Sequence, residues 1–129
     1  SGQKDVVVHT ERKRLTIFFS DIKDFTATTE RLQPEALTEM LNEYLTEMSN
    51  IALAHGGTID KFIGDGVMAL FGLNRTPEVA CRQALDAARR MSEALTDLNE
   101  ALSGDLDQPL RIGIGLHAGP AAGVGAGNA

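Results

Sequence analysis

Apolar side chains recur along the chain with different spacings, and each spacing predicts a different element. Residues 15–19 form a short β-branched and aromatic run that ends near Asp21, which predicts a buried strand. A short helical turn is predicted over residues 24–32. Residues 34–55 repeat apolar side chains every three or four positions, which predicts an amphipathic helix with Pro34 in its first turn. The predicted buried face of that helix consists of Leu37, Leu41, Tyr44, Leu45, Met48, Ile51 and Ala52.

The second half of the chain predicts a hairpin, a long helix and a strand. Residues 58–63 and 67–71 resemble strands, and the glycine-flanked Asp65 between them is typical of a tight turn. Thr76 followed by proline predicts the start of a helix that reaches about Leu102. Residues 110–117 alternate between apolar and small or polar side chains, as in a half-buried strand. The predicted core side of the long helix is Val79, Ala84, Ala87, Ala88, Met91, Leu95, Leu98 and Leu102.

This order of elements predicts the fold class. Strand, short helix, helix, hairpin, helix and strand indicate an α+β protein with a ferredoxin-like antiparallel sheet and helices packed on one face. In that topology the third strand lies beside the first and antiparallel to it. We therefore expect Asp21, at the end of the first strand, to meet Asp65, at the start of the third.

Two converging carboxylates suggest a metal site. Alone, Asp21 would more often cap a turn and Asp65 would more often be a turn residue. Together they would repel each other unless a hard cation lay between them, and Mg²⁺ or Mn²⁺ is bound by one or two carboxylates plus substrate phosphates. The chain enters a predicted helix just after Asp21, and free amides at a helix start suit triphosphate oxygens. The pattern predicts metal-dependent phosphoryl chemistry.

Composition narrows the alternatives. The chain has 129 residues, 43% of them hydrophobic and 23% charged, which fits one soluble globular domain. A net charge of −6 without a dense Lys/Arg cluster argues against nucleic acid and anionic lipid as partners. No apolar run is long enough for a signal peptide or a membrane span. Cys81 is the only cysteine, so we expect no disulfide and a reducing, cytoplasmic location.

The ends of the chain differ from its middle. Residues 1–14 are expected to be a solvated lead-in, and Ser1 and Gly2 resemble the dipeptide that cloning leaves behind. The segment 119–129 is almost wholly small or apolar and has no charged residue to solvate it, so we expect the domain to be interrupted there rather than finished.

Four segments together resemble one protein family. Residues 19–26, 41–44, 56–72 and 112–120 are similar, in order and spacing, to the class III nucleotidyl cyclase catalytic domain. The resemblance implies conversion of ATP to 3′,5′-cyclic AMP and pyrophosphate. It implies that Asp21, Asp65 and the Ile22 carbonyl bind two Mg²⁺ or Mn²⁺ ions. The backbone amides that it implies for phosphate binding are those of Lys23, Asp24, Phe25 and Thr26.

The resemblance also implies a base-reading residue and a dimer. The family lysine at the position of Lys61 contacts adenine, whereas guanylyl cyclases usually carry glutamate, so the chain looks like an adenylyl cyclase. Family sites form between two subunits, and Lys61 would serve the site opposite its own Asp65. The bare face at Gly113 and Gly115 suits a close homodimer contact, although packing within one chain explains it equally well.

The match is incomplete, which leaves alternatives open. Residues 15–129 cover only the N-terminal part of the family domain, without the second base-contacting residue or the Asn and Arg that meet ribose and phosphate. We therefore expect this chain by itself to be nearly inactive. The alternatives are a catalytically degenerate regulatory or nucleotide-binding module, a guanylyl cyclase and, more remotely, a diguanylate cyclase or polymerase palm. The family often carries a regulatory domain on the amino-terminal side.

Overall fold

The helices and strands follow one another in the predicted order. The computed structural model describes residues 6–128, with side chains from 12 to 121; the expected cloning dipeptide Ser1-Gly2 lies outside them. No helix in the described part is long and apolar enough to cross a membrane. The elements are β1 (Val6–Ile22), α1 (Phe25–Thr29), α2 (Pro34–Ala54), β2 (Thr58–Ile63), β3 (Gly66–Phe71), α3 (Pro77–Leu102) and β4 (Ile112–Asn128).

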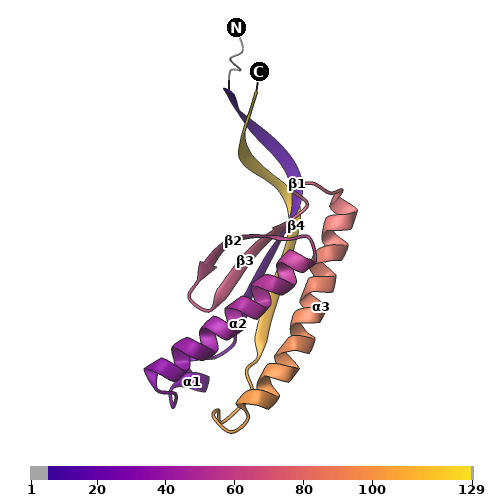
Figure 1. Cartoon of the computed structure of the whole chain (residues 1–129). Helices are drawn as coiled ribbons and strands as arrows, with labels where there is room; N and C mark the ends of the chain where they lie inside the picture. Colours follow the sequence, from indigo (N-terminus) through magenta and orange to yellow (C-terminus); the bar gives the residue numbers. More distant parts are fainter. Residues whose placement is uncertain (1–5, 129) are drawn as a thin grey trace.

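One antiparallel sheet holds the strands together. Its order is β2-β3-β1-β4, and each neighbouring pair is antiparallel. The long helices α2 and α3 lie side by side across one face of this sheet (Figure 1). This confirms the predicted ferredoxin-like α+β architecture, in which the crossover helices cover one face and leave the other open.

The first and last strands are much longer than predicted. β1 pairs with β4 along its whole length, from Val6 opposite Asn128 to Ile22 opposite Ile112. Residues 6–14, which we expected to be a lead-in, are part of β1, so the expected boundary after residue 14 falls inside a strand. The paired ends form a two-stranded ribbon that extends beyond the helices (Figure 1). Without a helix to cover it, the ribbon needs no alternating apolar pattern, so the sequence did not reveal it.

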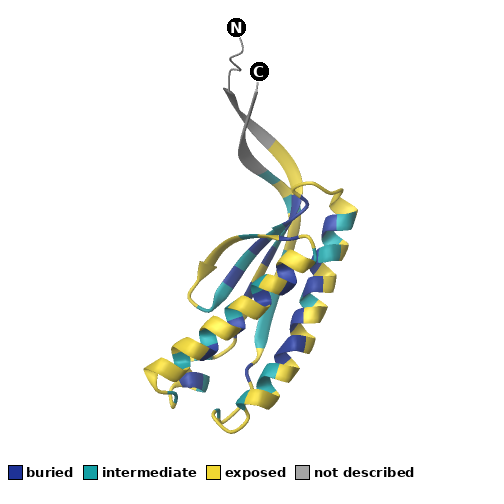
Figure 2. Cartoon of the chain, viewed as in Figure 1, coloured by how far each residue is buried: buried dark blue, intermediate teal, exposed yellow. Residues whose placement is uncertain are grey.

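The core lies between the sheet and the two long helices (Figure 2). The predicted face of α2 is confirmed, since its Tyr44 and Met48 are fully buried. On α3 the predicted Val79 is only half-buried, because the buried position in the first turn belongs to Ala80. Small residues dominate the inner side of α3, which lets the helix approach the sheet closely. The fully buried residues of the core are Phe18, Tyr44, Met48, Ala52, Ala69, Phe71, Ala80, Ala84, Ala87 and Met91.

Both long helices begin and end as the sequence predicts. Pro34 and Pro77 occupy first-turn positions, where a missing N–H costs nothing. The Thr76 hydroxyl accepts a hydrogen bond from Val79 N–H at 3.3 Å and caps α3. At the other end of α2, His55 is the C-cap, and its Nδ1 lies 2.8 Å from the Ile51 carbonyl oxygen.

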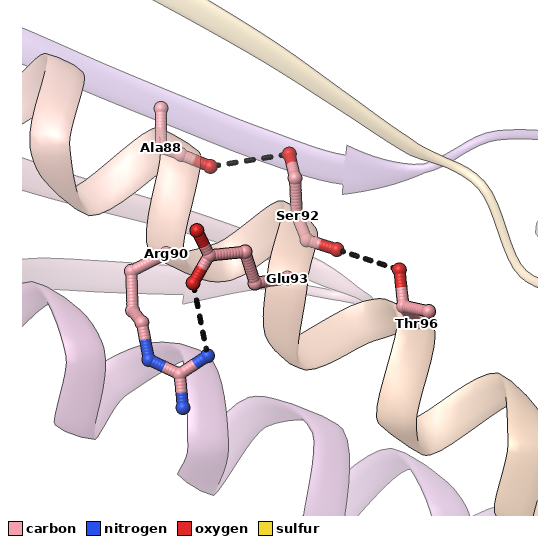
Figure 3. A network of polar contacts seen from close by, with 5 residues as sticks. All are labelled: Ala88, Arg90, Ser92, Glu93 and Thr96. Atoms are coloured by element: carbon pink, nitrogen blue, oxygen red, sulfur yellow. Dashed lines mark hydrogen bonds and ion pairs between the residues drawn. The ribbon is translucent and has the colours of Figure 1, made fainter.

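The outer face of α3 is polar and solvated. The Ser92 hydroxyl donates to the Ala88 carbonyl at 3.2 Å, and the Thr96 hydroxyl donates to the Ser92 carbonyl at 3.3 Å (Figure 3). Arg90 and Glu93 form an ion pair at 3.7 Å on the same helix (Figure 3). All these contacts are local to α3 and involve none of the predicted site residues.

The turn from α3 into β4 is fixed by one side chain. Asn99 Nδ2 donates to the Leu110 carbonyl at 2.9 Å, and Leu110 N–H donates to Asn99 Oδ1 at 2.7 Å. Leu110, predicted as the first strand residue, is therefore held by a helix side chain, and β4 begins at Ile112. This pair of hydrogen bonds sets where β4 enters the sheet beside β1.

Candidate functional site

The two carboxylates predicted as metal ligands lie at the same end of the sheet. Ser20 of β1 pairs with Val67 of β3, so the end of β1 lies beside the β2–β3 turn. There the Ile22 N–H donates to Asp65 Oδ2 at 2.7 Å. The convergence that topology predicted is confirmed, because Asp65 is bonded to the residue after Asp21. Asp65 is half-buried, whereas Asp21 is exposed.

A glycine makes room for the Asp21 carboxylate. Gly113 of β4 lies directly opposite Asp21 in the sheet. A Cβ atom at Gly113 would lie 3.4 Å from Lys23 Cε and only 2.7 Å from Asp21 Oδ1, closer than carbon and oxygen can approach. Gly115, two residues further on, has no atom within 4 Å of such a position. The predicted bare face is therefore occupied by the Asp21 side chain of the same chain at Gly113, whereas it is open at Gly115.

The turn that carries Asp65 requires glycine. Ile63 pairs with Gly66, so Gly64 and Asp65 form a two-residue hairpin loop. Gly64 has a φ of +59°, which suits a hairpin turn with glycine at its first loop position. At Gly66 a Cβ atom would lie 3.0 Å from the Ile63 carbonyl oxygen, so a side chain there would crowd the loop. Both glycines therefore help to place Asp65 against β1.

The open face of the sheet is hollowed beside the carboxylates. A cleft of about 610 Å³ is lined by residues of all four strands and of the turn after β1. Its volume lies within the range of small-molecule sites, roughly 300–1,000 Å³. Asp21 and Lys23 supply charged groups to its lining, and Phe19 and Met68 supply apolar surface. Phe19 is 45% exposed although it is a strand aromatic, so the cleft leaves an apolar wall free.

A bulge turns Lys61 toward this open face. Ile59 pairs with Ala69 and Lys61 pairs with Met68, so Asp60 is the extra residue of a β-bulge. Met68 in turn pairs with Phe19, and paired residues share a face of the sheet. Lys61 therefore lies on the face of the cleft, at the sheet's outer strand, but does not line the cleft of its own chain. Its Nζ is 3.6 Å from Asp60 Oδ2, and the side chain is exposed.

The turn after β1 differs from the expectation in one respect. The Lys23 N–H already donates to the Arg111 carbonyl at 2.8 Å, so this amide is not free for phosphate. The Lys23 side chain instead lines the cleft. Asp24 precedes α1 with a φ of 50°, and Phe25 and Thr26 form the first turn of that short helix. The amides after Lys23 therefore remain the candidates for phosphate contact.

Sequence reasoning missed an ion pair beside this turn. Arg111 Nη2 donates to Asp24 Oδ2 at 2.7 Å. The two residues are far apart in the sequence, and only the entry of β4 beside β1 brings them together. Strand alternation was the only signal at Arg111, and it predicts exposure without naming a partner.

Two buried hydroxyls lie beneath the carboxylates. Ser20 Oγ and Tyr44 Oη are buried, and neither completes a hydrogen bond. Burial raises the pKa of Tyr44 above its usual value, and the nearby Asp65 and Asp21 carboxylates raise it further, while contact with Ser20 opposes them. We predicted Tyr44 as a core residue, and it is one, but its hydroxyl end also faces the site.

The donor set fits a magnesium-type ion. Within the described part of the chain no group of three or more His, Cys, Asp or Glu side chains gathers. The site instead offers two carboxylates, from Asp21 and Asp65, next to a strand carbonyl at Ile22. Hard oxygen ligands in small number are what Mg²⁺ uses when substrate phosphates complete its coordination.

A protein-family model matches nearly the whole chain. The model describes the adenylate and guanylate cyclase catalytic domain, and it matches residues 7–128. An adenylate cyclase of Anabaena cylindrica is 40% identical over 111 residues, which are 83% of this chain and 21% of that protein. The terminal-differentiation-specific adenylate cyclase of Dictyostelium discoideum is 39% identical over 107 residues, 83% of this chain and 5% of that protein.

Solved cyclase structures share the fold. The adenylyl cyclase CyaB from P. aeruginosa has a TM-score of 0.82 and 43% identity, covering 88% of this chain and 60% of that chain. The guanylyl cyclase Cya2 has a TM-score of 0.78 and 34% identity, covering 92% of this chain and 64% of that chain. The chain thus spans less than two thirds of these structures and a small part of the two sequence relatives.

Proposed function

Because the chain belongs to the adenylate and guanylate cyclase catalytic domain family, we propose that it carries the metal-binding half of a cyclase site that converts ATP to cyclic AMP. The observation that carries this proposal is the hydrogen bond from Ile22 N–H to Asp65 at 2.7 Å, which ties Asp65 to the strand of Asp21. Adenylate cyclases from two distant organisms support the choice of ATP.

Asp21, Asp65 and the Ile22 carbonyl would hold two Mg²⁺ or Mn²⁺ ions where β1 ends, beside the cleft that Asp21 lines. Such ions supply charge neutralisation at a transferring phosphoryl group and activation of the attacking hydroxyl. The protein contributes fixed positions, because Asp65 is bonded to the backbone of β1 and Asp21 lies in the space above Gly113. Little reorganisation is then needed when substrate arrives.

The phosphates would lie along the turn after β1. The amides of Asp24, Phe25 and Thr26 and the ammonium group of Lys23 are the proposed contacts, with the Lys23 amide excluded by its bond to Arg111. Free N–H groups at a helix start and a nearby lysine both favour a polyanion. The Lys23 ammonium group and these amides would supply local positive charge for the phosphates, although the net charge of the chain is −6.

The purine would be read by a second copy of the chain. Lys61 lies on the open face but outside the cleft of its own chain, which supports a role across a homodimer interface. A lysine there would contact adenine, as the family resemblance implies. The similarity to the guanylyl cyclase Cya2, at 34% identity, keeps GTP as the second candidate substrate.

A direct assay tests the proposal in the protein in which this chain occurs naturally. Cyclic AMP and cyclic GMP are measured with Mn²⁺ or Mg²⁺ and equal ATP or GTP, for the wild type, Asp21→Ala and Asp65→Ala. The control is Asp86→Ala, which removes an exposed acid of α3 that pairs with Arg89 at 3.7 Å. We expect cyclic AMP from the wild type and the control only. Full activity in either site variant would sink the metal assignment, and a product made only from GTP would replace ATP with GTP.

A further inference from the structure

Asp24 occupies an unusual backbone position beside the site. Its φ of 50° places it in the left-handed region, and no other non-glycine residue of the described chain has a positive φ. Glycine adopts this conformation most readily, and aspartate is one of the few other residues that tolerate it. The side chain of Asp24 does not cap α1. Its carboxylate therefore contributes something other than helix capping at a position that glycine would fill more easily.

The Asp24 carboxylate is also a charge that the proposed substrate would meet. The proposed phosphate contacts begin at the Asp24 amide, and a triphosphate is strongly anionic. A free carboxylate at this turn would repel the triphosphate, because two negative charges a few ångströms apart raise the electrostatic energy. Something must therefore neutralise Asp24 or hold it away.

Arg111 does both. Its Nη2 donates to Asp24 Oδ2 at 2.7 Å, a distance typical of a strong charge-assisted hydrogen bond. Its backbone carbonyl accepts the Lys23 N–H at 2.8 Å, so one residue fixes the turn at two successive positions. Arg31, just after α1, forms a second ion pair with Asp107 of the same α3–β4 connection.

The pair lines a different hollow from the cleft. Asp24 and Arg111 line a separate hollow between α1 and the α3–β4 connection, together with Ala27 and Thr28. Neither residue lines the main cleft, which Lys23 does line. The ion pair thus holds the carboxylate outward and leaves the cleft side of the turn to Lys23.

We propose that Arg111 is a positioning residue for the triphosphate: it neutralises Asp24, holds that carboxylate out of the cleft and fixes the turn after β1. This inference rests on the proposed function. Arg111 acts through Asp24 and the turn and does not touch substrate, so it sets nucleotide affinity more than the rate of the chemical step. An arginine that contacted the reacting phosphate would instead govern kcat, whatever residue stood at position 24.

The test compares Arg111→Gln, Asp24→Gly, their double variant and Arg111→Lys in the natural protein, with kcat and KM for ATP measured separately. Arg89→Gln is the matched control, because Arg89 also pairs with a carboxylate on the surface, 3.7 Å from Asp86 on α3. We expect Arg111→Gln to raise KM about tenfold with kcat within about threefold of wild type. Arg111→Lys keeps the charge and should recover most of the affinity. In the Asp24→Gly background, the same Arg111→Gln change should raise KM less than about threefold.

Two results would overturn the inference: an unchanged KM in Arg111→Gln, or a rise in KM that is equal with and without the Asp24→Gly substitution. A wild-type protein without cyclase activity would refute the proposed function instead. In that case hydrogen exchange on the chain alone tests whether Arg111 positions the turn after β1. We expect Arg111→Gln to speed exchange of the amides of α1 while those of α2 and α3 keep their wild-type rates. Unchanged exchange in α1 would remove the positioning role.

Discussion

The backbone N–H of Ile22 donates a hydrogen bond to Asp65 Oδ2 at 2.7 Å, from the last residue of β1 to the β2–β3 turn. Asp65 is therefore positioned by the strand that carries Asp21, and the two carboxylates lie at the same end of the sheet. A charge-assisted bond of this kind stabilises more than a neutral one. It gives the site a shape before any ligand arrives.

Two substitutions at Asp65 separate its structural and chemical roles. Asp65→Asn keeps an oxygen that can accept the Ile22 N–H, whereas Asp65→Ala leaves that N–H without its partner. We expect Asp65→Ala to lower the free energy of unfolding by about 1–3 kcal/mol and Asp65→Asn by less than about 1 kcal/mol. Urea unfolding of both variants measures the difference. Equal stability of the two would show that the hydrogen bond contributes nothing to the fold.

Gly113 provides a second test, with a control two residues away. Gly113→Ala places a Cβ atom 2.7 Å from Asp21 Oδ1, so the carboxylate must move. Gly115→Ala meets nothing within 4 Å. We expect the dissociation constant for Mn²⁺ to rise about tenfold in Gly113→Ala, comparable to the loss of a residue that orients a metal ligand, and to stay unchanged in Gly115→Ala. Equal affinities in the two variants would contradict the role given to Gly113.

The raised pKa of Tyr44 makes the free energy of unfolding depend on pH in the alkaline range. Burial raises the pKa of Tyr44 in the folded chain above its ordinary value of 10.0, so the unfolded chain loses this proton first. The part of the free energy of unfolding that comes from the buried, protonated Tyr44 is fully present below pH 10. It falls as pH rises above 10, by at most about 1.4 kcal/mol per pH unit. Tyr44→Phe should abolish this part of the alkaline loss, measured by urea unfolding at several pH values.

The chain has one tyrosine and no tryptophan, so tyrosinate absorbance reports Tyr44 alone. We expect this absorbance to appear only as the chain unfolds. A reversible titration near pH 10 with native circular dichroism unchanged would show that the hydroxyl is not buried as described.

Lys61→Glu tests the base-reading role. Lys61 is exposed and its only ion pair in the described structure is with the neighbouring Asp60, so the substitution should change stability by less than about 0.5 kcal/mol. We expect the ratio of kcat/KM for ATP over GTP to fall in the natural protein, because glutamate suits guanine. Retained discrimination against GTP would mean that Lys61 does not read the base.

The sequence predicted the convergence of Asp21 and Asp65 because both follow from local patterns. Each lies at the boundary of a strand that its own apolar residues define, and the ferredoxin-like topology then fixes which strands are neighbours. The hairpin was also predicted from a local pattern, the glycines on either side of Asp65. For such features the periodicity of a few residues is sufficient.

Other features depended on register between distant strands. The space that Gly113 gives Asp21, and the pairing of Arg111 with Asp24, exist only because β4 enters the sheet at one register beside β1. The bulge at Asp60 likewise adds one residue to β2 that the hydrophobic pattern of the sequence does not predict. A shift of one residue would reverse the faces, so these contacts could not be read from sequence alone.

The most direct measurement is binding of Mn²⁺ alone to this chain, followed by electron paramagnetic resonance of the free ion. The site variant is Asp21→Asn with Asp65→Asn, and the control of equal net charge is Asp86→Asn with Asp97→Asn on α3. The carboxylate pair predicts that the site variant loses Mn²⁺ affinity by about tenfold or more while the control binds like the wild type. Equal binding by all three proteins would show that Asp21 and Asp65 are not the metal site.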